Sequence, residues 1–186
     1  MTTTTANRTR WTGTLLHHWP SLLGLLAAGF QIATGATRET VAITVSVATL
    51  CYLGAAALNR PWVAWAGLIW GSAVVTIGEL TGLVWWGAIG IAAAALVATG
   101  MFLRVPRPAL TAQTAALLGF GGSAVAALFL APRVGMVLAG LALASHAIWD
   151  VVHWRRNAVV PRSLAEFCVW LDVPLGVALI VLAFTG

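Results

Sequence analysis

Seven long apolar runs, separated by very short polar connections, constrain the fold of this chain more than any other feature. As a helix, a run of about 20 residues crosses the roughly 30 Å hydrocarbon core of a bilayer. The runs lie at about 19–37, 41–58, 61–81, 83–103, 110–131, 134–154 and 163–185. Because short connections force consecutive helices to be antiparallel, we expect an all-α polytopic membrane protein, a compact bundle of seven transmembrane helices.

The composition excludes a water-soluble globular protein. Of the 186 residues, 60% are hydrophobic and 8% are charged, whereas soluble domains carry about 25% charged residues. Lipid must therefore be the main solvent, and we expect one transmembrane domain over 14–186 after a short polar cytoplasmic tail at 1–13. The arginines are scattered and form no basic patch, so nucleic acid is not expected as a partner. Oligomerisation stays open.

The arginines predict the orientation, because positively charged residues gather on the cytoplasmic side of a membrane. With the N-terminus inside, eight arginines fall on the cytoplasmic side and two fall outside. The cytoplasmic set is Arg8, Arg10, Arg60, Arg104, Arg107, Arg155, Arg156 and Arg162, and the outer set is Arg38 and Arg133. We therefore expect the N-terminus inside and the C-terminus outside, in a bacterial cytoplasmic membrane.

The two cysteines, Cys51 and Cys168, both lie inside apolar runs. Their spacing is typical neither of a metal site nor of a disulfide framework. We expect two buried free thiols.

Five ionisable residues interrupt the last two apolar runs: Glu166 and the four candidate site residues His146, Asp150, His153 and Asp172. On a helix at about 100° per residue, His146, Asp150 and His153 fall within roughly 60° of one another and form one polar stripe. The helical rise puts His146 about 13 Å and Asp172 about 15 Å from the arginine-marked ends of their helices. Because these helices are consecutive and antiparallel, we expect the groups to meet. Ionisable side chains at such depth are costly and usually functional.

The context of Asp172 strengthens this expectation. Pro174 removes a backbone donor in the middle of the run, and a carboxylate beside an interrupted helix in mid-membrane usually lines a cavity or a polar path. Glu166 has a structural interpretation instead, because Ser163 and Glu166 have the S-x-x-E spacing of a capping box.

Several chemistries fit His146, Asp150, His153 and Asp172 as catalytic residues, and the residues alone leave them open. Imidazole and carboxylate groups can act as general acid and base without a metal. His146, Asp150 and His153 can ligate zinc or iron, although their spacing is no established signature. The same groups can relay protons in a transporter. A structural hydrogen-bonded cluster that joins the last two helices is the remaining interpretation.

Tryptophan is unusually frequent, with ten residues. Most of them lie near the expected membrane interfaces, where an aromatic belt explains them. Trp70, Trp149 and Trp170 lie deeper, near the levels of the histidines and aspartates. We expect these rings, with Glu79 near the outer end of the third run, to line a pocket for a hydrophobic substrate. Core packing is the alternative for the tryptophans.

Two resemblances add to this reading. The segment 146–153, with His146-x-x-Trp149-Asp150-x-x-His153, and the later Phe167-Cys168-x-x-x-Asp172 resemble the C-terminal part of small bacterial multipass membrane proteins, which implies no established activity. In length and number of spans alone, the chain is similar to the small integral-membrane terpene cyclases. That similarity implies intramembrane carboxylic acids and aromatic walls, but the histidines depart from it. A microbial rhodopsin is excluded, because the chain has no lysine to hold retinal.

These observations favour an intramembrane enzyme that acts on a lipid or isoprenoid-like substrate by acid–base or metal-assisted chemistry. The polar residues form one compact cluster and not a track across all the spans. A small proton- or cation-coupled transporter that uses the same cluster is the first alternative. A structural subunit of a membrane complex is the second. The expected partners are the lipid bilayer and a hydrophobic small molecule.

Overall fold

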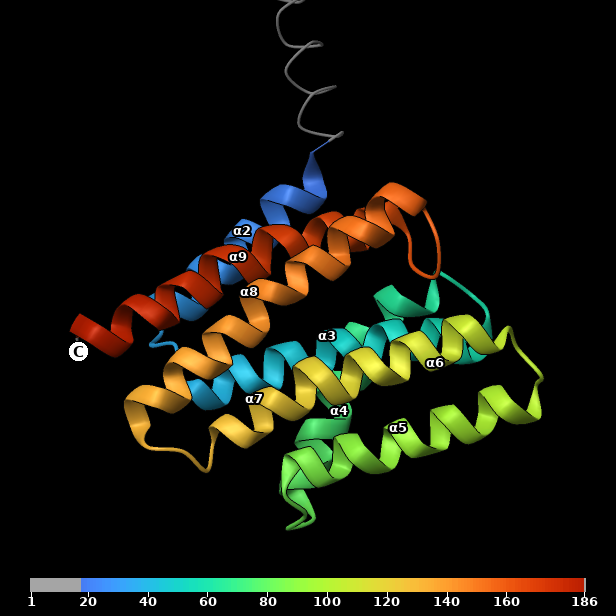
Figure 1. The fold of residues 1–186 in the computed structure, drawn as a ribbon, viewed down its shortest axis with the longest axis horizontal. Helices are drawn as coiled ribbons and strands as arrows, with labels where there is room; N and C mark the ends of the chain where they lie inside the picture. Colours follow the sequence, from blue (N-terminus) through green and yellow to red (C-terminus); the bar gives the residue numbers. More distant parts are fainter. Residues whose placement is uncertain (1–17, 186) are drawn as a thin grey trace, which may run out of the picture.

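The computed structural model describes residues 18–185, and within this range the chain is all-α (Figure 1). Its helices are α2 (Trp19–Ala33), α3 (Arg38–Leu58), α4 (Val63–Leu80), α5 (Trp85–Phe102), the continuous α6–η1–α7 (Arg107–Ala116, Leu117–Gly121, Gly122–Ala127), α8 (Pro132–Arg156) and α9 (Arg162–Thr185). Six of the seven helical segments are long and apolar enough to cross a membrane, and α2 is shorter, with 15 residues. The all-α, multi-pass character is thus confirmed. The tail expected at 1–13 lies outside the described residues.

Turn residues determine where the helices begin and end. Helix α2 stops at Ala33, short of the expected run, and the following Gly35 has φ +98°, a conformation that suits glycine. A capping box starts α3: the Thr37 side chain accepts a bond from the Thr40 N–H, and the Thr40 hydroxyl accepts one from the Thr37 N–H. A tight turn with Gly82 at φ +76° separates α4 from α5, where the sequence shows little division.

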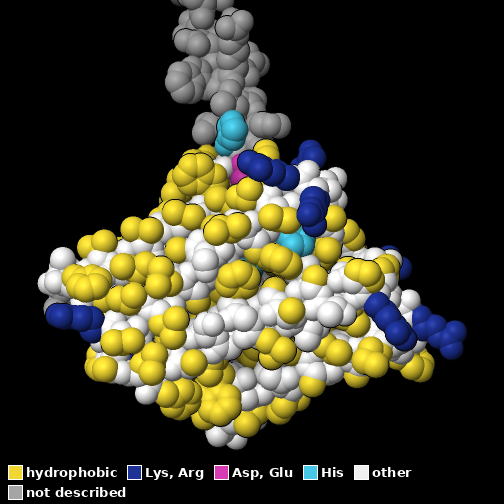
Figure 2. Space-filling view, in the orientation of Figure 1, with side chains coloured by type: hydrophobic (Ala, Val, Ile, Leu, Met, Phe, Trp, Pro, Cys, Tyr) yellow, Lys and Arg dark blue, Asp and Glu magenta, His cyan; other side chains and the backbone are white. Residues whose placement is uncertain are grey.

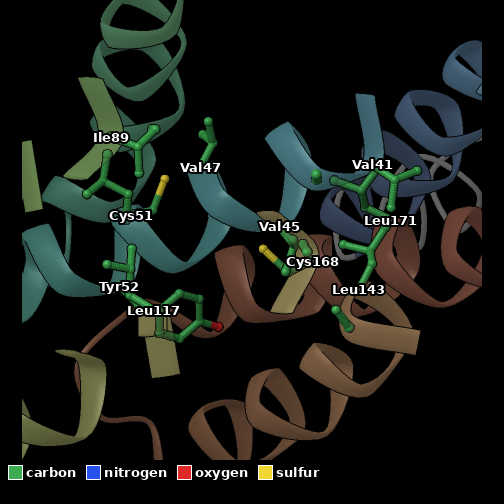
Figure 3. Close-up of a cluster of buried hydrophobic side chains, with 14 of the residues drawn as sticks. Val41, Val45, Val47, Cys51, Tyr52, Ile89, Leu117, Leu143, Cys168 and Leu171 are labelled. Carbon is green, nitrogen blue, oxygen red and sulfur yellow. The ribbon is translucent and has the colours of Figure 1, made fainter. Parts of the chain in front are cut away.

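Helix α3 is the centre of the bundle. Most of its residues are buried, whereas each of the other five long helices buries less than half of its apolar stretch. In Figure 1, α2, α8 and α9 lie on one side of α3, and α4 and α5 lie on the other. Figure 3 shows Val45 of α3, Leu143 of α8 and Leu171 of α9 in the shared core. Cys51 and Cys168 are buried free thiols, as expected.

The backbones of α8 and α9 approach closely at two glycines. A Cβ added at Gly140 would lie 2.7 Å from the carbonyl oxygen of Gly176, and a Cβ at Gly176 would lie 2.7 Å from the carbonyl oxygen of Gly140. Neither position has room for a side chain, which is the small-residue packing typical of helices in membranes. The crossing lies within two helical turns of His146 and of Asp172, and it brings these two side chains within reach of each other.

The outer surface suits a lipid environment. Figure 2 shows hydrophobic side chains spread over the visible face, with arginines gathered toward its edges. Arg38 donates a hydrogen bond to the Leu130 carbonyl at 2.9 Å, and Arg133 donates one to the Ala183 carbonyl at 3.0 Å. Each guanidinium thereby satisfies a backbone oxygen near a helix C-terminus, where a cation is favoured.

Candidate functional site

Three ionisable side chains lie together in the interior, and we call them the His–Asp–Asp group: His146, Asp150 and Asp172. All three have 0% solvent exposure. His146 Nδ1 lies 2.8 Å from Asp172 Oδ2 and 3.3 Å from Asp150 Oδ2. The four-residue spacing on α8 places the first two on one face, and the crossing with α9 adds the third. The structure therefore brings together three of the four residues that the sequence singled out.

Helix α3 contributes a tyrosine to this group. The Tyr52 hydroxyl donates a hydrogen bond to Asp150 Oδ1 at 2.6 Å, across a separation of 98 residues. The Tyr52 ring also meets His146 edge-on, with ring centroids 5.7 Å apart. Tyr52 is 1% exposed, and Figure 3 shows its ring within the buried cluster. Nothing in the sequence pattern pointed to Tyr52 as a site residue.

A π-helical turn, η1, adds an aromatic wall. Phe120 of this turn packs edge-on against the His146 ring, with centroids 5.2 Å apart. The same Phe120 side chain lines a pocket of about 350 Å³ between α6–η1 and α8, together with small residues such as Gly119, Ala142 and Ser145. π-Helical turns are frequent at functional sites. Phe120 thus contacts both this outer pocket and His146.

The hydrogen bonding of the group is incomplete. His146 Nε2, Asp150 Oδ2 and Asp172 Oδ1 are buried and have no hydrogen-bond partner among the described residues. Each carboxylate therefore has one oxygen that accepts a hydrogen bond and one that accepts none. An unpaired buried polar atom costs about 1–3 kcal/mol, and a charged one costs more. A native structure that retains three such atoms in one place is typical of a functional site.

His153 belongs to a second polar cluster, nearer the end of α8. Its Nε2 lies 3.0 Å from Gln113 Nε2, and its Nδ1 lies 2.8 Å from the Trp149 carbonyl. Trp149 Nε1 in turn donates to Gln113 Oε1 at 3.0 Å. Both ring nitrogens of His153 thus have hydrogen-bond partners. His153 is therefore not placed to bind a metal together with His146 and Asp150, as the sequence had led us to expect, and Asp172 takes its place beside them.

The residues expected to line a substrate pocket do not converge on the group. Trp149 lies in the second polar cluster, Trp170 is 44% exposed, and Trp70 packs against Gly54 of α3. Glu79 is exposed near the end of α4. Of these four, only Trp149 lies beside buried polar side chains.

Ser163 and Glu166 bond to other helices and do not form the expected capping box. Helix α9 begins one residue before Ser163, so that Ser163 already lies inside it. The Ser163 hydroxyl oxygen accepts a bond from Trp65 Nε1 at 3.0 Å, and the Ser21 hydroxyl donates to Glu166 Oε1. These two bonds join α4 and α2 to the start of α9.

The fold and the site thus define a multi-pass α-helical protein with a buried His–Asp–Asp group. Comparison of the chain with protein-family models, with curated proteins and with solved structures finds no match. The function must then follow from the geometry of the group itself.

Proposed function

We propose that this chain is an intramembrane enzyme that acts on a lipid or isoprenoid-like substrate reached from the bilayer. The observation that carries the proposal is the His–Asp–Asp group, three fully buried ionisable side chains with three unpartnered polar atoms. A charged residue in the middle of a transmembrane helix costs about 2.5–3.5 kcal/mol on insertion scales, and such residues are usually functional. A purely structural role would favour groups that satisfy one another.

The chemistry that suits the group is acid–base or metal-assisted rearrangement of a hydrophobic chain, such as isomerisation or cyclisation. In such a reaction one proton adds at a carbon of the substrate and another proton leaves a different carbon, so that the product is an isomer of the substrate. A metal ion would assist as a Lewis acid that polarises the substrate. Water is not consumed, which fits a site with no solvent exposure. Asp150 and Asp172 each present a free oxygen, and His146 lies between them. Neighbouring groups of this kind can donate and accept a proton.

The pocket beside Phe120 supports a hydrophobic substrate. It lies between α6–η1 and α8, and its walls are mostly alanine, glycine and leucine. Phe120 borders both this pocket and His146. A change in the Phe120 side-chain conformation would connect the pocket to the group. A molecule that approaches by this route comes from the lipid and needs an apolar surface.

A proton- or cation-coupled transporter is the second candidate. Gln113 and His153 favour it, because they extend the buried polar residues toward the arginine-rich end of α8. In the other direction, α8 buries Leu143, Gly140 and Ala139. The buried polar side chains of α8 therefore continue on one side of His146 only. A transport path across the protein would need residues of other helices, such as the buried Ser46 and Thr49 of α3.

We also propose seven spans with the N-terminus inside and the C-terminus outside, in a bacterial cytoplasmic membrane. The α3–α4, α5–α6 and α8–α9 connections or their flanking helix ends carry six arginines, and the α2–α3 and α7–α8 connections have two, Arg38 and Arg133. This bias supports the orientation. Helix α2 is only about 22 Å long at the usual helical rise. It can cross where the bilayer thins locally.

Deuterium uptake tests the enzyme proposal. The purified chain is reconstituted in vesicles that contain polyprenols, polyprenyl diphosphates and a bacterial lipid extract, in D2O. An enzyme that adds one proton and removes another labels its product with deuterium, which mass spectrometry detects. We expect Asp150→Asn and His146→Gln to slow labelling by about 10²–10⁴-fold. Glu166→Gln, which changes a carboxyl group outside the site, is the matched control. Equal labelling by the site variants and the wild type would refute the proposal.

A further inference from the structure

We propose that the His–Asp–Asp group binds one divalent transition-metal ion, zinc above all, through His146 Nδ1 and one oxygen each of Asp150 and Asp172. The catalytic role of this ion rests on the proposed function, in which it would act as a Lewis acid that polarises the substrate. Its binding does not rest on that function, because an ion can be held without any turnover.

The spacing of the three side chains fits such an ion. One ligand atom from each residue lies within 4.8 Å of the other two, and His146 Nδ1 lies 2.8 and 3.3 Å from the nearest oxygens of Asp172 and Asp150. Zinc binds nitrogen and oxygen ligands at about 2.0–2.2 Å, so that the ligands of a tetrahedral ion lie about 3.3 Å apart. Small rotations of the carboxylates therefore suffice to bind the ion.

The charge of the group suits a cation. When both are ionised, Asp150 and Asp172 place two negative charges in an apolar interior at 0% exposure, where uncompensated charge is strongly destabilising. Within residues 18–185, the one basic side chain that pairs with Asp150 and Asp172 is His146. One divalent ion beside a neutral imidazole balances both carboxylates.

Each carboxylate has an oxygen available for the ion. Asp150 Oδ1 is held by the Tyr52 hydroxyl, and Asp150 Oδ2 accepts no hydrogen bond and faces His146 Nδ1 at 3.3 Å. Asp172 Oδ2 lies 2.8 Å from the same nitrogen, so that the ion would take the place of a proton on His146 Nδ1. A hydrogen bond to the second oxygen of a ligating carboxylate is the usual outer support of a metal site. Three protein ligands leave a fourth position for a substrate group, which is the arrangement of catalytic zinc.

Metal analysis of the purified, full-length chain in detergent tests the inference. The protein is stripped with a chelator and titrated with Zn²⁺, and with Co²⁺ as a coloured substitute for zinc. We expect about one ion per chain, and loss of binding in Asp150→Asn and Asp172→Asn. Tyr52→Phe should weaken binding about 10–100-fold, as expected for an outer-shell partner. Glu166→Gln, which changes a carboxyl group bonded to Ser21 outside the site, is the control and should bind as the wild type does.

A ligand exchange keeps the test decisive if an asparagine variant does not fold. In His146→Cys a thiolate replaces the imidazole, and Co²⁺ should then show a sulfur-to-cobalt charge-transfer band that the wild type lacks. Absence of stoichiometric metal in the wild type, or equal loss in Glu166→Gln, would overturn the metal site. Deuterium labelling that persists without metal would leave the enzyme proposal standing alone. Bound metal without labelling of any lipid would leave the metal site standing and refute the enzyme proposal.

Discussion

Removal of the Tyr52 hydroxyl should destabilise the metal-free protein. In Tyr52→Phe, Asp150 loses the 2.6 Å hydrogen bond that its Oδ1 accepts, and its Oδ2 accepts no hydrogen bond and lies 3.3 Å from His146 Nδ1. A hydrogen bond to a charged group contributes about 1.5–3 kcal/mol, whereas neutral bonds between membrane helices average about 0.6 kcal/mol. We expect a loss of about 2 kcal/mol in the free energy of unfolding, because the acceptor is fully buried. That loss corresponds to about a 30-fold shift in the folding equilibrium.

The assay is reversible unfolding in mixed detergent–SDS micelles, after chelation and followed by tryptophan fluorescence. A double-mutant cycle with Tyr52→Phe and Asp150→Ala, which leaves the Tyr52 hydroxyl no acceptor at position 150, isolates the energy of this one pair. Thr44→Val is the matched control, because the Thr44 hydroxyl makes a neutral bond to Gln31 of α2 at 3.1 Å. Its loss should cost about 0.6 kcal/mol. A coupling energy between Tyr52 and Asp150 below about 0.5 kcal/mol would show that the bond contributes no more than an ordinary one.

Two further predictions concern helix packing and orientation. Gly140→Ala places a Cβ 2.7 Å from the Gly176 carbonyl oxygen. It should lower the free energy of unfolding, measured by thermal denaturation, by about 1–3 kcal/mol. Gly29→Ala, with no atom within 4 Å of its Cβ, should change little, and equal effects would contradict the close crossing. Ala131→Cys should react with a membrane-impermeant maleimide in intact cells, and Asn157→Cys only after permeabilisation. The native cysteines are 1% exposed and should not react, and the opposite pattern would reverse the orientation.

Much of the fold was predictable, because a membrane imposes strong rules on sequence. Each apolar run of about 20 residues became a helix, and the short connections made neighbours antiparallel. The meeting of His146 with Asp172 followed from equal depths on two consecutive helices. His146 and Asp150 followed from their spacing of four residues, which returns to the same helix face. Local periodicity was sufficient for these three residues.

The remaining site residues depend on contacts that periodicity does not encode. Tyr52 lies 98 residues from its partner Asp150, and only the packing of α3 between the other helices brings them together. The sequence held only a weak indication of this role, because Tyr52 is a single tyrosine within an apolar run. Trp170 could have been excluded, because two residues rotate a helix by about 200° and turn it away from Asp172.

The two polar clusters of α8 distinguish structure from function within one helix. In the cluster of Gln113, Trp149 and His153, the ring nitrogens of His153 and the indole N–H all have partners, as expected where hydrogen bonds serve packing. The His–Asp–Asp group, which is buried more completely, leaves one atom of each residue without a partner. The same chain therefore satisfies a buried histidine in one place and does not do so a short distance away. Since such atoms lower stability, their retention in the most buried position is best explained by a ligand or substrate that they serve.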